Sequence, residues 1–345
     1  MKFGFLNISL LLSFHIFISS LACGWVKCQD MQFSQSYAAP LYLNPALTGN
    51  TKQMRFASVY RNQWASIPGY VSYAFSYDHN LRMRNSGVGL FFNNDKAAKG
   101  ALSLTGINAL YSYKILVTRF KGINFGLRGG YVNRKLDKNK LLFGDQIIRN
   151  SSSTIETFPV EQFGYFDAAA GVVSYSPGYW LGVSADHLNR PEQSFLSSGN
   201  HLPVKFTVHG GAHFFETVKP TDQSLVSRLT LTGIYKAEKK WDQLDLGMYF
   251  RYSPLMYGIW YRGIPVFKKY KEGYRNNDAV ALMLGINTSN IIFAYSYDIT
   301  ISKLSENTGG SHEISFIYEY VAPKFSKNMN RKKEIPCTKL IGVEF

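Results

Sequence analysis

Two histidines are the first candidates for chemistry in this chain. His209 and His213 stand four residues apart, a spacing that brings two imidazoles to one metal when the segment is a helix. The residues around them alternate between apolar and polar types, which is typical of a strand. On a strand the two Cα atoms would be roughly 13 Å apart, too far for one metal. We therefore predict no metal site at this pair.

A second stretch, Ser311-His312-Glu313, holds the residue types of a hydrolase. A serine nucleophile needs a histidine base within hydrogen-bond reach. Neighbouring residues of a strand point to opposite faces, and no Gly-x-Ser-x-Gly turn occurs in the chain. Phosphate-loop, dinucleotide-binding, HExxH and CxxC patterns are also absent from the sequence. We predict a protein that is not an enzyme and uses neither cofactor nor metal.

The elements that would position these residues are strands. Tyrosine (23) and phenylalanine (25) are abundant, and mean hydropathy is close to zero at -0.13. Such a mixture suits strands with one apolar and one wet face, either in a soluble sandwich or in a membrane barrel. Alternating runs occur at 53–64, 70–79, 86–93, 101–114, 121–132, 163–175, 179–187, 203–215, 226–236, 243–252, 255–262, 278–287, 290–300 and 311–321.

The connections between these runs decide between the two architectures. Counted in order, the even connections include tight turns such as 176–178, 253–254 and 288–289. The odd connections include the long polar segments 133–162, 188–202, 263–277 and 301–310. A barrel with short periplasmic turns and long external loops has this parity, whereas a sandwich does not. We predict an all-β fold, a transmembrane antiparallel β-barrel of roughly 14 strands.

In a barrel, each side chain of an alternating strand faces either the lipid or the lumen. In the last hairpin the apolar set would face lipid, with tyrosines as interfacial anchors: Ile291, Phe293, Tyr295, Tyr297, Ile314, Phe316, Tyr318 and Tyr320. Charged residues would face the lumen: Arg61, Arg128, Asp167, Asp186, Asp245, Arg251, Arg262 and Glu319.

Both ends of the chain fall outside the barrel at 53–321. Residues 1–28 are typical of a cleaved signal peptide, and we place the cut between Cys28 and Gln29. Lipidation at Cys23 and retention as a membrane anchor are the alternatives. An even strand count would leave an N-terminal segment, 29–52, and a C-terminal tail, 322–345, in the periplasm.

The formal net charge of +15 calls for an acidic partner. In the cell envelope that partner would be anionic outer-membrane lipid or an acidic protein, and we exclude nucleic acid. Part of the charge lies in the tail, which either docks to a periplasmic partner or is a solvated end: Lys324, Lys327, Arg331, Lys332 and Lys333.

Seven strings follow one another along nearly the whole mature chain. They are Asp30-Met-Gln-Phe-Ser-Gln35, Asn44-Pro45-Ala-Leu-Thr-Gly49, Arg61-Asn-Gln-Trp64, Gly182-Val-Ser-Ala-Asp186-His187-Leu-Asn-Arg-Pro191, Trp260-Tyr-Arg262-Gly263-Ile-Pro265, Ser296-Tyr-Asp298-Ile-Thr-Ile-Ser302 and Gly309-Gly-Ser-His312-Glu313-Ile-Ser315. In this order they resemble the PorP/SprF family of type IX secretion membrane proteins.

The resemblance implies an integral outer-membrane barrel of Bacteroidota that serves the type IX secretion and gliding machinery. The partners it implies are the periplasmic ring complex with its peptidoglycan-binding lipoprotein, or the C-terminal domain of a secreted adhesin. The residues it singles out for structure or partner contact are Asn44, Pro45, Arg61, Trp64, Asp186, His187, Pro191, Arg262, Gly263, Asp298, His312 and Glu313. We expect a non-enzymatic protein that binds partners, with a passive channel for small solutes as the alternative.

Overall fold

The computed structural model describes most of the chain after residue 29. The described residues are 30–67, 69–81, 84–118, 120–152, 154–155, 160–195, 199, 201–218, 225–239, 241–264, 269–271, 274–288, 290–302 and 308–320. The chain divides into two compact units, Met1–Gln32 and Phe33–Phe345, and the second unit holds all the elements below. The signal peptide, the cleavage residues Cys28 and Gln29, and the C-terminal tail lie outside the described residues.

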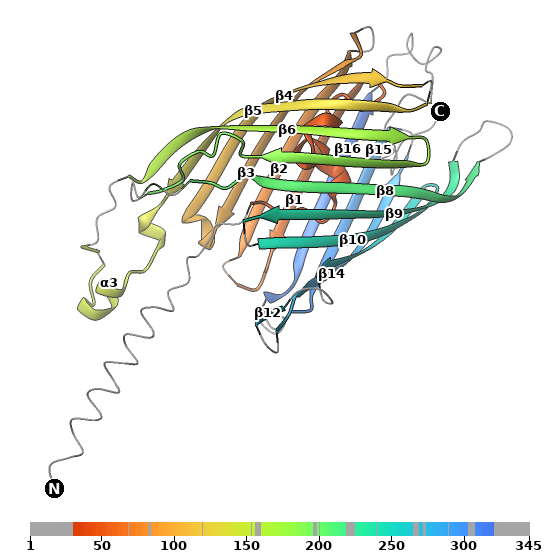
Figure 1. The fold of residues 1–345 in the computed structure, drawn as a ribbon. Helices are drawn as coiled ribbons and strands as arrows, with labels where there is room; N and C mark the ends of the chain where they lie inside the picture. The colour runs from red at the N-terminus through yellow and green to blue at the C-terminus, as the bar shows by residue number, and fades with distance from the viewer. Residues whose placement is uncertain are drawn as a thin grey trace. The chain divides into compact units, whose positions relative to one another are not determined.

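Fourteen antiparallel strands close into one barrel (Figure 1). Each strand pairs with its neighbours in chain order, and the barrel closes where β1 pairs with β16 from Met54↔Tyr320 to Gln63↔Ser311. The barrel strands are β1 (Met54–Gln63), β2 (Tyr70–Leu81), β3 (Ser86–Ala97), β4 (Leu102–Leu116), β5 (Gly122–Leu136), β6 (Gln162–Ser176), β7 (Tyr179–Asp186), β8 (Lys205–Val218), β9 (Leu225–Glu238), β10 (Trp241–Tyr252), β11 (Leu255–Gly263), β14 (Asn277–Asn287), β15 (Ile291–Thr300) and β16 (Ser311–Tyr320).

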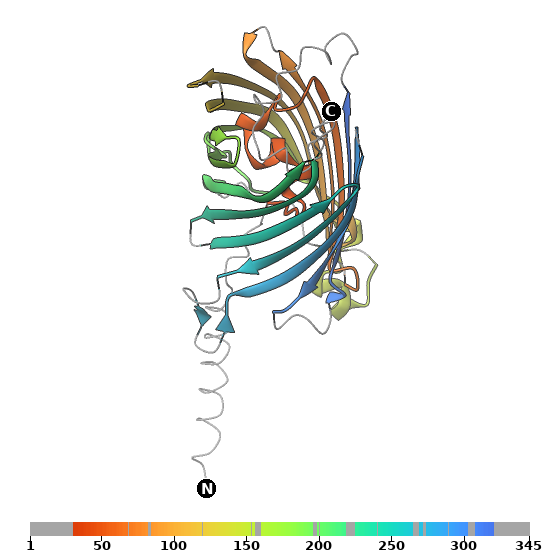
Figure 2. The ribbon, with the colours of Figure 1, turned by 90° about the vertical axis from the view of Figure 1, so that its right-hand side faces the viewer.

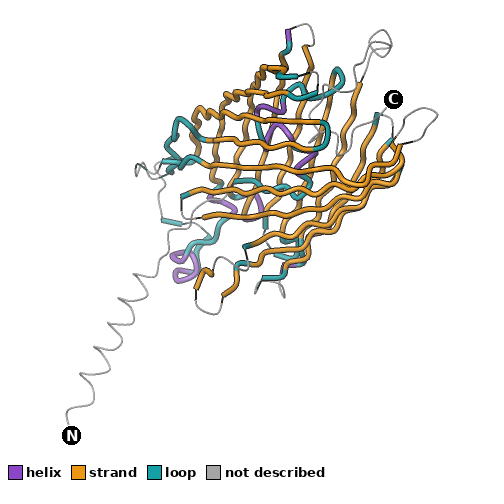
Figure 3. The backbone as a smooth tube through the Cα atoms, turned by 45° about the vertical axis from the view of Figure 1, so that its right-hand side comes forward, coloured by secondary structure: helices purple, strands orange, loops and turns teal. Residues whose placement is uncertain are grey.

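The structure confirms the predicted barrel and its strand number. A separate two-stranded sheet, β12 (Lys269–Lys271) with β13 (Tyr274–Arg275), lies in the connection from β11 to β14 and was not predicted. Helix α3 (Gly144–Arg149) and the 3-10 turn η5 (Lys138–Lys140) lie in the connection from β5 to β6, and η4 (Ala98–Gly100) lies between β3 and β4. Figure 3 shows how strands make up most of the barrel wall.

The strands alternate between an exposed outer face and a buried inner face, as their period of two requires. On the outside, Ile107 is 63% exposed and Leu127 is 62% exposed. In the last hairpin Phe293 and Phe316 are exposed, whereas Glu313 and Ser315 are buried. The apolar face therefore looks outward to lipid, as the sequence predicts.

The connections divide by length between the two ends of the barrel. All even connections are short, and the longest of them is 219–224. The odd connections include the long segments 137–161, 187–204, 264–276 and 301–310, but 64–69, 98–101 and 239–240 are short. We call the end with the even connections the turn mouth and the other end the loop mouth. Met54 and Tyr320 lie side by side at the turn mouth.

Residues 33–52, named the lumen segment below, lie inside the barrel (Figure 2). The segment forms three short helical pieces, η1 (Ser36–Ala38), α2 (Pro40–Leu43) and η2 (Pro45–Leu47). Leu41, Ala46 and Leu47 are fully buried within it.

This position corrects the expectation that residues 29–52 form a separate periplasmic segment, as far as residues 33–52 are concerned. The even strand count does bring Met54 and Tyr320 to one mouth. The chain before Met54, however, runs back through the lumen, because inward-facing side chains of the wall bind its backbone. Ser34 therefore lies near the loop mouth, at the opposite end from Tyr320.

The described residues contain neither a membrane-spanning helix nor a cluster of metal-binding side chains. No helix in that part of the chain is long and apolar enough to cross a membrane. No group of three or more histidine, cysteine or acidic residues among them could hold a metal ion.

Candidate functional site

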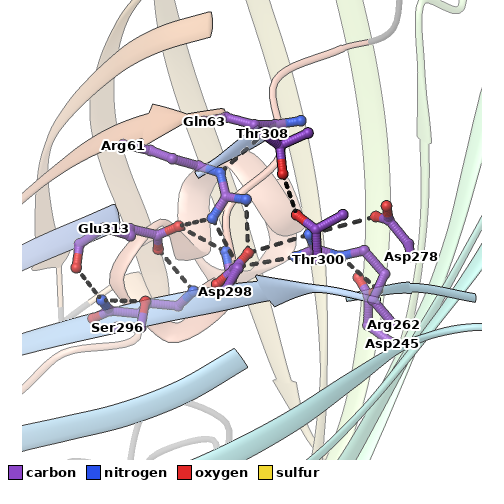
Figure 4. A network of polar contacts seen from close by, with 12 residues as sticks. Arg61, Gln63, Asp245, Arg262, Asp278, Ser296, Asp298, Thr300, Thr308 and Glu313 are labelled. Atoms are coloured by element: carbon purple, nitrogen blue, oxygen red, sulfur yellow. Dashed lines mark hydrogen bonds and ion pairs between the residues drawn. The ribbon is translucent and has the colours of Figure 1, made fainter. Parts of the chain in front are cut away.

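Four charged residues predicted from the sequence meet inside the barrel near the loop mouth (Figure 4). Arg61 on β1 bridges two carboxylates, with Nη2 2.7 Å from Asp298 on β15 and Nη1 2.9 Å from Glu313 on β16. Arg262 on β11 reaches the same Asp298 carboxylate at 3.3 Å. Every one of these side chains is at most 8% exposed. We call these four residues the latch.

The latch extends along the wall through Asp245 on β10. Its Oδ1 lies 3.2 Å from Nε of Arg262, and its Oδ2 lies 3.5 Å from Nζ of Lys236 on β9. Asp278 on β14 adds a longer contact of 3.8 Å to Arg262. Buried charges need partners of opposite sign and hydrogen bonds to offset lost hydration, and this chain of contacts supplies both.

The start of the lumen segment completes the latch. Glu313 accepts two consecutive backbone N–H groups, those of Ser34 and Gln35, each at 2.8 Å. The Ser34 hydroxyl donates to Asp298 at 2.7 Å and accepts from Arg61 at 2.8 Å and from Arg262 at 2.9 Å. The latch is therefore a binding site for a piece of main chain, and its occupant is the protein's own N-terminal segment.

The Gln35 side chain extends this contact. Its amide donates to Ser296 Oγ and to the Glu313 backbone carbonyl, each at 3.1 Å, and its oxygen accepts from Ser315 at 2.5 Å. The Tyr37 hydroxyl also donates to that oxygen, at 2.7 Å.

The middle of the lumen segment is organised by Asn44-Pro45. Asn44 caps η2, because its Oδ1 accepts from the Ala46 N–H at 2.9 Å, and Pro45 occupies the first helical position, where no N–H is needed. The Asn44 amide also reaches the wall, donating to the carbonyls of Val172 at 3.3 Å and Val183 at 3.1 Å. One side chain thus shapes the segment and attaches it to β6 and β7.

Glycines on the inner face of the wall leave room for the segment. A Cβ on Gly126 of β5 would overlap the backbone of Pro45 and Ala46. A Cβ on Gly171 of β6 would overlap the Asn44 side chain. Glycine inside a strand often marks the close approach of another backbone, and these two positions require it.

The end of the lumen segment is fixed at the turn mouth. The carbonyl of Thr48 accepts from Ser112 Oγ at 2.6 Å, and the N–H of Gly49 donates to Asp78 at 2.9 Å. Asp78 is itself held by Arg55 on β1 at 2.9 Å. The segment is thereby bound along its length, from the latch to the start of β1.

A second charged cluster lies on the opposite part of the wall. Arg128 Nη2 is 2.8 Å from Asp186 and 3.6 Å from Asp167, and His187 Nδ1 is 2.8 Å from the same Asp167. Lys205 pairs with Asp186 at 3.4 Å, and its Nζ lies 5.1 Å from the ring centre of Tyr42 in the lumen segment.

Other candidate residues from the sequence lie apart from the latch. His312 points outward, where Nδ1 is 2.7 Å from the Tyr295 hydroxyl, while Ser311 is buried, so the two share no face. Trp64 has a left-handed backbone (φ 62°) and packs on Tyr70. Gly263 (φ 140°) approaches the Asn276 backbone closely, and the carbonyl of Pro191 accepts from the Leu202 N–H at 2.9 Å.

The predicted docking residues of the tail fall outside the described residues: Lys324, Lys327, Arg331, Lys332 and Lys333. Sequence reasoning also missed the roles of Ser34, Gln35 and Gly126. The signal for Gly126 was available, because a glycine at an inward position of a strand indicates a close backbone approach. Nothing in the strand pattern indicated which segment approaches.

Fold and site together define an integral β-barrel of the outer membrane whose lumen holds the protein's own N-terminal segment. The family model for the type IX secretion system membrane protein PorP/SprF matches residues 26–318. The chain therefore belongs to the PorP/SprF family.

Solved structures similar to this chain are outer-membrane barrels of low identity. The outer membrane protein Omp33 of Acinetobacter baumannii is 7% identical, with 79% of this chain and 100% of that chain covered and a TM-score of 0.43. The toluene transporter TodX of P. putida is 10% identical, with 81% and 93% covered and a TM-score of 0.40. BamA from Haemophilus ducreyi lacking POTRA domains 1–3 is 8% identical, with 77% and 70% covered and a TM-score of 0.40. No curated protein matches the chain.

Proposed function

We propose that this protein is a non-enzymatic component of the type IX secretion machinery that binds partner proteins at the two mouths of its barrel. The partners are the periplasmic ring or its peptidoglycan-binding lipoprotein, or the C-terminal domain of a secreted adhesin. The observation that carries the proposal is the lumen segment, which occupies the route that a transported molecule would take. With that route occupied, the mouths and the outer wall remain as surfaces for function.

The two mouths offer different surfaces. Long connections gather at the loop mouth, where 137–161 and 187–204 are the longest. Short turns and the end of β16 lie at the turn mouth. In outer-membrane barrels short turns face the periplasm. We therefore assign the turn mouth and the basic tail at 322–345 to the periplasm, and adhesin contact to the loop mouth.

The outer wall serves the membrane rather than a partner protein. Its exposed side chains are largely apolar and aromatic, as a lipid-facing band requires. Anionic lipid head groups are counterparts for part of the net charge of +15.

A passive channel for small solutes is the alternative function. It is favoured only by the polar inner wall, and the same polar groups bind the lumen segment. Purified protein in planar bilayers separates the two functions. Steady ion conductance by the intact barrel would support the channel, and its absence would support a closed, partner-binding barrel.

The test of partner binding is a pull-down of tagged protein from detergent-solubilised outer membranes, with and without residues 322–345. Ring or peptidoglycan-binding components that are lost on truncation would identify a periplasmic anchor. Adhesin domains that are kept after truncation would identify a partner that acts at the loop mouth. Recovery of no secretion component by the intact chain would contradict the proposal.

A further inference from the structure

One hairpin projects from the barrel at the turn mouth. Strand β8 pairs with β7 only as far as Tyr179↔Ala212, but it continues to Val218. Its other neighbour, β9, stays paired with it to Val218↔Leu225, and β10 covers β9 as far as Tyr252↔Ser227. Figures 1 and 3 show this hairpin running on past the strands beside it.

The projecting part of β8 has one open edge. Among the described residues, no strand pairs with Phe214–Val218 on the side away from β9. At a rise of 3.2–3.4 Å per residue, these five residues extend roughly 15 Å. An open edge presents backbone donors and acceptors that can pair with another extended chain.

The same residues expose apolar side chains. All five are exposed, with Phe215 at 83% and both Phe214 and Val218 at 44%. The register shifts between Phe214↔Leu229 and Thr217↔Ser227, where the two β8 residues Phe215 and Glu216 lie opposite the single β9 residue Arg228, so β8 carries one extra residue. Phe215 takes a left-handed backbone there (φ 50°), a conformation that is rare for a bulky residue. A β-bulge changes the direction in which a side chain points, and at this bulge the Phe215 side chain points to the outside of the protein.

We infer from a neighbouring tyrosine and from the open edge itself that the end of the projection lies outside the hydrocarbon layer. Phe214 is level with Leu229 and Phe250 on the outer face, and Tyr252, 56% exposed, is the next outward residue toward the turn mouth on β10. Tyrosines mark the membrane interface in outer-membrane barrels. An open strand edge does not occur in hydrocarbon, because its peptide groups would lack partners.

We propose that Phe214–Val218 is a docking element for an extended segment of a partner protein, which adds a strand to the edge of β8 and receives Phe215 in an apolar pocket. Backbone pairing recognises an extended chain, and a buried aromatic anchor supplies much of the affinity at such contacts. Because the bulge interrupts the edge, the added strand is short and depends on Phe215. The inference rests on the proposed function, under which the partner is a periplasmic protein of the secretion machinery.

Charge at the edge is consistent with this occupant. Glu216, the one charged residue of the projection, is paired with Arg228 on β9 at 2.7 Å. Edges that are guarded against pairing carry charged residues or proline, whereas this edge has its single charge neutralised. A neutral, apolar partner strand therefore meets no uncompensated charge.

The test uses a photo-crosslinking phenylalanine analogue placed at position 215 of the full chain in cells, with the same analogue at Ile148 as control. Ile148 is 86% exposed on α3, at the loop mouth. We expect an adduct between position 215 and a type IX secretion protein of the periplasm, with no such adduct from position 148. In the pull-down, Phe215→Asp and Thr217→Pro should each lower recovery of that protein at least about tenfold, whereas Ile148→Asp should not.

The outcomes separate this inference from the proposed function. Equal recovery of the secretion protein by the wild type and by correctly folded Phe215→Asp would overturn the docking element and leave the proposed function standing. No secretion protein with the wild type would overturn both. Adducts with lipid alone, together with weaker flotation of Phe215→Asp on phosphatidylethanolamine–phosphatidylglycerol vesicles, would assign Phe215 to the membrane and overturn the docking element.

Discussion

The fit between the barrel wall and the lumen segment is tested by adding one methyl group to Gly126. This glycine faces inward from β5, and a Cβ at its position would overlap the backbone of Pro45 and Ala46. Backbone cannot rotate away as a flexible side chain can, so Gly126→Ala must displace the lumen segment. Displacement would also break the bond from Asn124 Nδ2 to the Ala46 carbonyl, now 3.2 Å long.

The loss of stability expected for Gly126→Ala is the sum of these two effects. Overpacking costs about 1–3 kcal/mol, and a lost hydrogen bond adds about 1 kcal/mol. The assay is urea unfolding of the barrel in lipid vesicles, where Gly126→Ala should lower the free energy of unfolding by about 2–4 kcal/mol.

Gly129 on the same strand provides the matched control. A Cβ there would meet nothing within 4 Å, on the exposed outer face. Gly129→Ala should therefore leave the free energy of unfolding nearly unchanged. If both variants unfold at the same urea concentration, the lumen segment is not seated against β5, and the reasoning from its contacts fails.

Three further changes test other contacts. Glu313→Gln should lower the free energy of unfolding by about 3–5 kcal/mol in the same assay, because Arg61 would keep its buried charge with one carboxylate fewer. An unchanged free energy of unfolding would refute the latch. Asn44→Ala should lower the free energy of unfolding by about 1–2 kcal/mol, because the cap of η2 and the hydrogen bonds to the wall are lost. Wild-type stability of this variant would argue that Asn44 does not attach the lumen segment to the wall. A hydrogen bond from the Ile155 N–H lowers the pKa of Asp145 to about 2. Since this folded-state pKa lies below the ordinary 3.8, the stabilisation is present above about pH 4 and is lost as pH falls through about 2. The protection factor of the Ile155 amide, the ratio of the exchange rate of an unstructured chain at the same pH to the observed rate, should therefore fall over that range. Asp145→Asn should show the low protection factor at neutral pH.

The barrel could be predicted because alternation and connection length are local properties. The alternation of residue types within each strand indicates its inner and outer faces. The alternation of short and long connections then favours a closed barrel over a sandwich. Phe293 and Glu319 were assigned to opposite faces by this rule alone, and the structure confirms the assignment. Three odd connections do not follow the predicted alternation of short and long connections, because 64–69, 98–101 and 239–240 are short.

The lumen segment could not be predicted in the same way. Its helical pieces are three or four residues long, too short to show a helical period. Its position depends on contacts between residues far apart in the chain, such as Ser34 with Asp298 and Ala46 with Asn124. Arg61 and Arg262 of the latch were expected to face the lumen, but their pairing with Asp298 and Glu313 needs the register of strands that are distant in sequence.

The most direct test of the proposed function is the surface proteome of cells that lack this protein. We predict that one or a few proteins exported by the type IX system disappear from the cell surface, and that they return when the wild-type chain is supplied. A surface proteome that is unchanged by the deletion, in cells whose type IX system is active, would contradict a role in secretion or surface attachment.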